Sequence, residues 1–462
     1  MSEVLFALSQ AAAWIPGAEL VGDAQAPVRR VHTDTRSLQV GDCFVALRGE
    51  RFDGHDFLPQ LGTLGVHVAI AERGLAEAGL SGLQVNDTRE ALGQLAQGWR
   101  AAHAVGLIAV TGSNGKTTVT QMIAAILRAH CGEAALSTQG NFNNDIGVPL
   151  TLLRVRDHHR LAVLELGMNH PGEIARLAAW VQPQVALVNN AQREHQEFMH
   201  SVRAVALENG AVLQALPANG VAVFPSDDEH TPLWREAAGA RTVLTFGADG
   251  DVQAMQSART GLGWTGRMAC PRLGIEFEFE LAMPGEHNLR NAMAATACAL
   301  SAGVPADAIA RGLSDFRPVA GRSQAQTLQL GQKKITLVDD TYNANPDSVR
   351  AAIDVLAQLP APHVLVLGDM GEVGEQGPEF HAEVGRYARE RGIEHLLTHG
   401  SQAELAAQAH GQAQHHPSIE PLCAELDRLC LQAGSVLVKG SRFMKMERVV
   451  RHLQASQEPA TC

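Results

Sequence analysis

Residues 107–118 read LIAVTGSNGKTT, and this stretch decides the fold. The apolar run at 107–110 predicts a buried β-strand, and residues 116–129 have the pattern of a helix. A strand, a glycine-rich turn and a helix N-terminus in this order are typical of a phosphate-binding loop. Val110 stands where the general pattern GxxxxGKS/T has its first glycine, so the prediction depends on the strand before the turn and the helix after it. The motif indicates nucleotide binding but no particular reaction.

The residue types in this loop suit the binding of a phosphate chain. Gly112 and Gly115 allow a tight turn in which backbone N–H groups point towards phosphate oxygens. Lys116 can neutralise those oxygens, and the Thr117 hydroxyl can bind magnesium at the helix N-terminus. A glycine turn without a ligand is the alternative interpretation.

Short apolar runs alternate with helical patterns in two long stretches of the chain. This alternation, over residues 107–186 and again over 335–438, predicts two parallel sheets with helices on both faces. Between them, residues 275–281 alternate apolar and acidic side chains, which is typical of a half-exposed antiparallel strand. The N-terminal part mixes short apolar segments with polar turns, as a small α+β unit does.

We therefore expect an α/β protein with three domains. Residues 1–84 form a small α+β domain, and residues 85–317 form a central domain with a parallel sheet and an antiparallel addition. Residues 318–462 form a Rossmann-like domain. A helix predicted over 87–103 leads into the central domain, and the segment SDFRPVAGRSQ (314–324) indicates a linker before the last one.

Composition excludes several classes of protein. Of the 462 residues, 45% are hydrophobic and 19% charged, which is ordinary for a globular protein. The formal net charge of −12 argues against nucleic acid as a partner. The seven cysteines contain no CxxC pair and indicate reduced thiols. No apolar run suits a membrane span, and no basic residue precedes Arg29 as a secretory signal requires, so we expect a cytoplasmic chain without membrane insertion.

Polar residues follow the apolar runs of both predicted parallel sheets. In doubly wound sheets ligands bind at the carboxyl ends of the strands, so these junctions suggest two facing half-sites, although any one of them is equally explained by the polarity of loops. The residues at the junctions are Thr111, Glu165, Asn189, Asp339, Asp340, Asp369 and Lys439.

Glu165 and His195 are candidate metal ligands. A carboxylate at the end of the apolar run LAVLELG needs a partner when buried, and magnesium bound to nucleotide phosphates is one, with an Arg or Lys ion pair as the alternative. His195 follows Asn189 by six residues; it is a metal or phosphate ligand or else a surface histidine. The other histidines form no closed set of zinc ligands at suitable spacing.

Several motifs in order along the chain resemble the Mur ligase family. They extend from VHTDTRSLQVGDCFVALRGERFDGHDF (31–57) to the C-terminal part, so the likeness covers nearly the whole chain. The others are TGSNGKTT (111–118), LELGMNHPGEI (164–174), PGEHNLRNAMAA (284–295), DDTYNANPDSVRAA (339–352), LGDMGEVGEQG (367–377) and VLVKGSRFMKMERVV (436–450).

The resemblance implies ATP-dependent formation of an amide bond. Within the family the motifs are most similar to those of the ligases that join D-alanyl-D-alanine to a UDP-MurNAc-tripeptide during peptidoglycan precursor synthesis. The γ-phosphate passes to the substrate carboxylate, and the dipeptide amine attacks the acyl phosphate. Because the transferred and tetrahedral species are anionic, magnesium and a lysine are the expected stabilisers. ATP and magnesium are therefore the implied cofactors.

The same resemblance assigns roles to individual residues. Lys116, Glu165 and His195 are the expected catalytic residues, and Thr117, Glu165 and His195 the metal ligands. The ATP-binding set is Gly112, Asn114, Gly115, Lys116, Thr117, Thr118, Asn288, Asn291, Arg322 and Asp340. The substrate-binding set is Asp34, Thr35, Arg36, Arg48, Asn141, Asn143, Asn144, Tyr342, Asn343, Asn345 and Lys439, with the first four at the uridine-nucleotide end. For each asparagine a turn or a helix cap is the structural alternative.

One position departs from the family pattern. Relatives usually carry a lysine that carbon dioxide converts to a magnesium-binding carbamate in a stretch like AVARAKGEI, whereas residues 204–212 read AVALENGAV here. Asn209 takes the place of that lysine and cannot form a carbamate, although it can offer a carbonyl oxygen, and Glu208 can add charge. The stretch QREHQEFM (192–199) is also more polar than its counterpart in relatives.

Other functions are less consistent with the motifs. The ligase that adds the third amino acid usually has a DNPR-type motif, which is absent here, and LGDMGE favours the dipeptide-adding enzyme. Folylpolyglutamate synthase lacks the N-terminal uridine-nucleotide domain. A phosphate-loop ATPase or switch protein gives the third domain no role, and a scaffold protein is not expected to place charged residues at so many strand ends. We expect a monomer.

Overall fold

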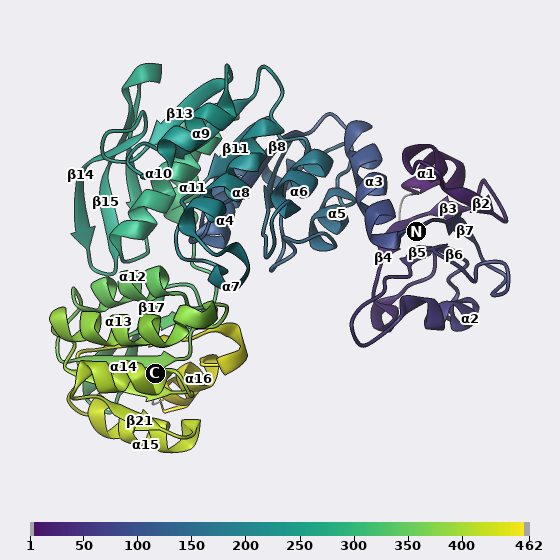
Figure 1. Ribbon diagram of the computed structural model, residues 1–462. Helices are drawn as coiled ribbons and strands as arrows, with labels where there is room; N and C mark the ends of the chain where they lie inside the picture. The colour runs from purple at the N-terminus through teal and green to yellow at the C-terminus, as the bar shows by residue number, and fades with distance from the viewer. Residues whose placement is uncertain (1–3, 457–462) are drawn as a thin grey trace.

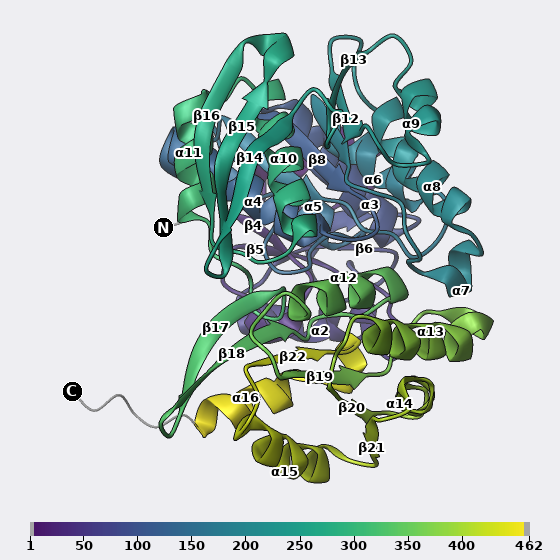
Figure 2. The same ribbon diagram turned by 90° about the vertical axis from the view of Figure 1, so that its left-hand side faces the viewer.

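The computed structural model describes residues 4–456, which form three lobes, each with its own β-sheet (Figure 1). The N-terminal lobe lies at the right-hand end of the middle lobe in Figure 1. The C-terminal lobe lies below the middle lobe in both Figure 1 and Figure 2. The α/β class and the arrangement in three lobes agree with the sequence prediction. No helix in residues 4–456 is long and apolar enough to cross a membrane.

The N-terminal lobe contains a five-stranded sheet in the order β2-β7-β6-β5-β4. All of its neighbouring strands are parallel except β2 and β7. The elements are β1 (Phe6–Ala7), α1 (Leu8–Trp14), β2 (Glu19–Val21), β3 (Pro27–Val28), β4 (Arg30–His32), β5 (Asp42–Val45), α2 (Leu58–Leu61), β6 (Val68–Ala71) and β7 (Ser81–Gln84).

Helix α3 (Thr88–Ala101) lies between the N-terminal and middle lobes. Its N-cap is Asp87, whose carboxylate accepts hydrogen bonds from the backbone N–H groups of Arg89 and Glu90, as the sequence suggested. Two glycines let the helix lie close to a tryptophan on each side. A Cβ atom at Gly98 would come within 2.2 Å of Trp14, and one at Gly93 within 2.2 Å of Trp180.

The middle lobe is built on a six-stranded parallel sheet in the order β13-β12-β11-β8-β10-β9. The antiparallel sheet β14-β15-β16 includes the strand predicted at 275–281. The elements are β8 (Gly106–Thr111), α4 (Lys116–Cys131), β9 (Ala135–Ser137), α5 (Gly147–Leu152), β10 (Leu161–Glu165), α6 (Glu173–Val181), β11 (Val185–Val188), α7 (Gln196–Met199), α8 (Val202–Gln214), β12 (Val221–Pro225), α9 (Thr231–Ala238), β13 (Thr242–Phe246), β14 (Gln253–Thr260), β15 (Gly263–Cys270), β16 (Ile275–Leu281), α10 (Glu286–Ser301) and α11 (Ala306–Asp315).

Strand β8 shows how this sheet is buried on both faces. Leu107 and Ala109 belong to one apolar core with residues of α3, α6 and α8, whereas Ile108 and Val110 belong to another with residues of α4, α10 and α11. Successive side chains of a strand point to opposite faces, so a run that is apolar throughout is what a doubly covered sheet requires. This packing fixes the strand that delivers the glycine-rich turn.

The C-terminal lobe has a six-stranded sheet in the order β17-β18-β22-β19-β20-β21. The sheet predicted from the sequence was parallel, whereas the observed sheet has an antiparallel edge, where β17 and β18 form a hairpin around Gly331. The elements are β17 (Gln324–Leu330), β18 (Lys333–Asp340), α12 (Pro346–Leu356), β19 (His363–Gly368), α13 (Gly377–Glu390), β20 (His395–His399), α14 (Ala403–His410), β21 (Gln414–His416), α15 (Ile419–Cys430), β22 (Ser435–Lys439) and α16 (Glu447–Ala455).

Candidate active site

A cavity of about 1330 Å³ lies where the middle and C-terminal lobes meet. Its walls include the turn after β8, the ends of β10 and β11, and the loops that follow β18 and β22. The predicted site residues that line it are Asn114, Gly115, Lys116, Thr117, Thr118, Asn141, Asn143, Asn144, Glu165, His195, Asn288, Asn291, Arg322, Asp340, Tyr342, Asn343, Asn345 and Lys439. The two sheets thus place their strand ends at one shared space.

The glycine-rich turn between β8 and α4 depends on two left-handed glycines. Gly112 has φ of 129° and Gly115 has φ of 81°, values that side chains other than glycine rarely adopt. A Cβ atom at Gly115 would also lie 2.6 Å from Oδ1 of Asn291 and 2.7 Å from Nδ2 of Asn189. The turn therefore has room only for glycine at this position.

Asparagines from the end of β11 fix the turn. Nδ2 of Asn189 and Nδ2 of Asn190 both donate to the carbonyl oxygen of Asn114, at 2.8 and 3.0 Å. Oδ1 of Asn190 accepts from the backbone N–H of Asn114 at 2.9 Å. Asn189 also donates to Oδ1 of Asn291, whose own amide donates to Asn288 at 3.2 Å. Asn291 thus lies against the glycine-rich turn, Asn288 lies beside it, and both line the cavity.

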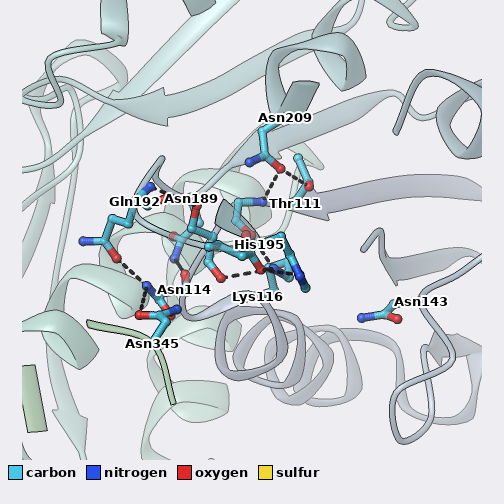
Figure 3. A network of polar contacts seen from close by, with 12 residues as sticks. Thr111, Asn114, Lys116, Asn143, Asn189, Gln192, His195, Asn209 and Asn345 are labelled. Carbon is cyan, nitrogen blue, oxygen red and sulfur yellow. Dashed lines mark hydrogen bonds and ion pairs between the residues drawn. The ribbon is translucent and has the colours of Figure 1, made fainter. Parts of the chain in front are cut away.

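Lys116 is held by three acceptors in this structure (Figure 3). Its ammonium donates to the carbonyl oxygens of Gly112 at 2.6 Å and Ser113 at 3.1 Å, and it forms an ion pair with Glu194. Glu194 was not among the predicted site residues. Its position directly before His195 in a loop after a buried strand was the signal that could have identified it.

His195 lies between two carboxylates. Its Nδ1 is 2.8 Å from Glu372 of the C-terminal lobe, and its Nε2 is 3.5 Å from Glu194. Burial lowers the pKa of His195, but the hydrogen bonds and charges of Glu194 and Glu372 outweigh it and raise the pKa to about 9. The ring therefore links the middle lobe to the C-terminal lobe as a cation.

Glu165 ends β10 on the floor of the cavity and is only 2% exposed. Nδ2 of Asn143 donates to its Oε1 at 2.7 Å, while its Oε2 is buried without a hydrogen-bond partner. No arginine or lysine pairs with it among the residues that the structure describes. Of the two predicted partners for this carboxylate, the Arg or Lys ion pair is therefore absent among the described residues, and one buried carboxylate oxygen is left without a partner.

Asn209 and Glu208, the proposed substitutes for a carbamylated lysine, both have other contacts. Oδ1 of Asn209 accepts from the Thr111 hydroxyl at 2.6 Å and from the Gly112 N–H at 3.0 Å (Figure 3). The Glu208 carboxylate accepts from the N–H groups of Gly172 and Ile174, both at 2.8 Å, at the start of α6. Asn209 thus ties α8 to the end of β8 and the glycine-rich turn, and Glu208 caps α6.

The C-terminal lobe contributes a buried ion pair. Nζ of Lys439 lies 2.5 Å from Oδ2 of Asp340 and donates to the carbonyl oxygen of Asn343 at 3.0 Å. Burial raises the pKa of Asp340, but Lys439 outweighs it, and the net pKa is lowered. Nearby, the guanidinium carbon of Arg322 lies 4.0 Å from the ring centroid of Tyr342, which is a stacked arrangement.

Two of the predicted asparagines make local structural contacts as well. Asn345 caps α12, and its Nδ2 donates to Oδ1 of Asn114 at 2.9 Å, so it also bridges the two lobes (Figure 3). Oδ1 of Asn144 accepts from the Gly147 N–H at 2.9 Å at the start of α5. The structural alternative that the sequence left open is therefore observed at both positions.

The predicted uridine-end residues do not line the cavity. Asp34 and Arg36 form an exposed ion pair at 2.6 Å with Thr35 between them, and Arg48 lies 3.2 Å from Glu72. They belong to the N-terminal lobe, whereas Glu50 of the same lobe does reach the cavity wall. Gly112, which was also predicted for the site, does not line the cavity, and its N–H donates to Asn209.

Sequence models of three Mur ligase domains match successive parts of the chain. The Mur ligase family catalytic domain matches residues 27–100, the Mur ligase middle domain residues 110–299, and the Mur ligase glutamate ligase domain residues 321–442. The chain belongs to the Mur ligase family. Each lobe of this Mur ligase thus has its own matching domain.

Relatives extend the match over the whole length of this Mur ligase. It is 41% identical over 453 residues to the UDP-N-acetylmuramoyl-tripeptide–D-alanyl-D-alanine ligase of Escherichia coli strain K12, which covers 97% of this chain and 96% of the relative. A crystal structure of MurF from Acinetobacter baumannii superposes with a TM-score of 0.91 at 35% identity, covering 97% and 99% of the two chains. A MurF from Thermotoga maritima solved in complex with ADP gives a TM-score of 0.81 at 26% identity, covering 93% and 98%.

Proposed function

We propose that this Mur ligase joins D-alanyl-D-alanine to the free carboxylate of a UDP-MurNAc-tripeptide, using ATP. The observation that carries the proposal is the shared cavity, which has the phosphate loop with Lys116 on one wall and the Asp340–Lys439 pair on the other. The name of the Escherichia coli relative, a tripeptide–D-alanyl-D-alanine ligase, supports the choice of substrates, because the two chains align over nearly their full length.

ATP is the proposed nucleotide, and its phosphates are expected to lie on the turn between β8 and α4. There, backbone N–H groups at the start of α4 and the Lys116 ammonium favour an anion. The ADP complex of the Thermotoga maritima relative supports this assignment. Asn288 and Asn291 are proposed to approach the adenine, and Arg322 with Asp340 to contact ATP from the C-terminal lobe.

Magnesium fits the donor set on this side of the cavity. Glu165 offers a buried carboxylate oxygen without a partner, and Thr117 offers a hydroxyl at the helix N-terminus. His195, the third predicted ligand, is a cation between two carboxylates here and would have to release its proton to bind a metal. Within residues 4–456 no three His, Cys, Asp or Glu side chains form a ready metal site, so phosphate oxygens or water must complete the coordination. When bound, magnesium neutralises developing charge on the transferred phosphoryl group.

The residues of the chain then act on a carboxylate that is a poor electrophile. Lys116 stabilises the anionic phosphoryl group while the γ-phosphate passes from ATP to the substrate carboxylate, so that an acyl phosphate forms and ADP leaves. The dipeptide amine attacks the acyl carbon and loses a proton to solvent, and the tetrahedral species releases phosphate to give the amide. Asn143 holds Glu165 in place by a hydrogen bond of 2.7 Å. Tyr342, Asn343, Asn345 and Lys439 are proposed to position the incoming dipeptide where the C-terminal lobe meets the loop.

The remaining substrate would extend towards the N-terminal lobe. Asn141, Asn143 and Asn144 lie on the cavity wall between the phosphate loop and that lobe, and are proposed to contact the muramoyl-peptide. Asp34, Thr35, Arg36 and Arg48 are proposed to bind the uridine nucleotide. A monomer is sufficient for this arrangement, since all three lobes come from one chain.

Phosphate release tests the proposal. Purified protein with ATP and magnesium is expected to release phosphate only when both UDP-MurNAc-tripeptide and D-alanyl-D-alanine are present. Release without either acceptor would indicate an ATPase. Release with UDP-MurNAc-dipeptide and a free amino acid in their place would indicate the ligase that adds the third residue.

A further inference from the structure

Glu194 is a buried carboxylate at the phosphate loop that the proposed reaction leaves without a role. The residue is 8% exposed and lines the cavity. Its Oε1 forms the ion pair with Lys116 and lies 3.5 Å from Nε2 of His195, whereas its Oε2 is buried without a hydrogen-bond partner. A buried carboxylate oxygen without a partner is costly, which indicates that a ligand completes the site.

The other carboxylates at the cavity do not share this feature. Only Glu165 and Glu194, among the described carboxylates that line the cavity, have a buried oxygen with no partner. Glu372 uses its carboxylate on His195 at 2.8 Å, and Asp227 is paired through both oxygens with Arg290. Glu165 and Glu194, which both line the cavity, thus each have one buried carboxylate oxygen without a hydrogen-bond partner.

Nucleotide binding would leave the Glu194 carboxylate without its cationic partner. All three donors of the Lys116 ammonium are taken by Gly112, Ser113 and Glu194 in this structure. When Lys116 donates to phosphate instead, Glu194 loses its counter-charge. A buried carboxylate would then face phosphate oxygens of the same sign, and a divalent cation between them removes that repulsion.

We propose that Glu194 is a divalent-cation ligand of the nucleotide site. Its Oε2 binds the ion that accompanies the phosphates, and Lys116 then donates to those phosphates instead of to Glu194. The inference rests on the proposed function only in that a nucleotide occupies the loop. In this proposal Glu194 supplies negative charge to the cation. Asn209 is neutral and cannot do so, and its oxygen already accepts hydrogen bonds from Thr111 and Gly112.

Calorimetry of ADP binding tests the proposal without turnover. The affinity of the full-length protein for ADP is measured in EDTA and again in Mn²⁺, and the ratio gives the gain from the cation. For Glu194→Gln we expect this gain to fall about tenfold or more. Its affinity for ADP in EDTA is expected to stay the same or rise, because the amide competes less well than the carboxylate for Lys116.

Asp227→Asn is the matched control. It removes one negative charge from the same cavity, but from a carboxylate whose oxygens are both taken by Arg290. We expect it to keep the wild-type gain from Mn²⁺. An equal loss in both variants would mean that the net charge of the cavity matters and would overturn a specific role for Glu194.

If Glu194→Gln shows the same increase in ADP affinity from Mn²⁺ as the wild type, the proposal is also overturned. Glu194 is then only the counter-ion of Lys116. Thermal unfolding checks that the variant folds, and Glu194→Ala carries the same expectation if it does not. Failure of the wild-type protein to bind ADP in Mn²⁺ would contradict the proposed function itself. The failure of the proposed function and the failure of the Glu194 proposal are therefore distinguishable.

Discussion

Arg193 of the middle lobe pairs with Asp347 of the C-terminal lobe. Its Nη2 lies 2.6 Å from Oδ1 of Asp347, and its backbone N–H donates to Oδ2 of the same carboxylate at 2.9 Å. The guanidinium also lies 2.6 Å from Glu383, and both of its carboxylate partners are partly buried. Arg193 therefore holds the C-terminal lobe over the phosphate loop by charge-assisted hydrogen bonds.

Replacing Arg193 is expected to open the molecule. Arg193→Ala removes the contacts to Asp347 and Glu383 and should weaken the closed arrangement by about 2 kcal/mol. Small-angle scattering should show a larger radius of gyration than in the wild type. Arg386→Ala, which removes an exposed pair with Glu379 within one helix, should leave the scattering curve unchanged. Equal curves for Arg193→Ala and the wild type would remove the role of this contact.

The same contact predicts a pH dependence of closure. The hydrogen bond from Arg193 lowers the pKa of Glu383 below the ordinary glutamate value of 4.5 in the closed form. A lowered pKa means that the carboxylate stabilises closure at pH values above 4.5 and that this contribution disappears as the pH falls through the lowered value. Scattering measured between neutral and acidic pH should report opening on the acidic side. The response should be smaller in Arg193→Ala, and an equal response in both chains would contradict the assignment to Glu383.

Lys116 is expected to be essential for turnover but not for the fold. Lys116→Ala removes the ammonium that faces the phosphates, so phosphate release should fall below detection. Circular dichroism should be unchanged, because the side chain contacts only the loop and Glu194. Unchanged activity would exclude the turn at 111–118 as the site of phosphate transfer.

Asn209 is expected to act on the loop and not on the metal. Asn209→Ala leaves the Thr111 hydroxyl and the Gly112 N–H without their acceptor, both of them buried, and should cost about 1–3 kcal/mol of stability. Chemical denaturation measures that loss. The magnesium concentration for half-maximal activity should be the same as in the wild type, and an increase would instead assign a metal role to Asn209.

Local patterns in the sequence predicted the elements that place the site. The helix N-cap at Asp87, the apolar strand at 107–110 and the polar residues at the strand ends all depend on short-range rules of propensity and packing. Because parallel strands end at the same edge of a sheet, Lys116 and Glu165 were predicted to lie together, and both line the cavity.

Features that depend on contacts between distant segments could not be predicted from the sequence. Asn209 was a candidate metal ligand by alignment, but it lies 98 residues from Thr111 in the chain, and only the fold shows that they bind each other. Glu194 was passed over because a carboxylate in a polar loop is ordinary until its burial is known. The hairpin of β17 and β18 was missed because its two-residue turn, Gly331 followed by Gln332, is a weak signal between polar strands.

The contacts of α3 imply different mechanical properties on the two sides of the middle lobe. The joint between the N-terminal and middle lobes contains apolar packing, because Trp14 lies close to Gly98 and Trp180 lies close to Gly93 of α3. Such packing resists sliding of one surface over the other. Against the C-terminal lobe the joint consists largely of ion pairs and amide contacts, which exchange readily with water. We therefore expect the distance between the proposed uridine site and the phosphate loop to stay fixed, and we expect opening of the molecule to occur at the joint with the C-terminal lobe.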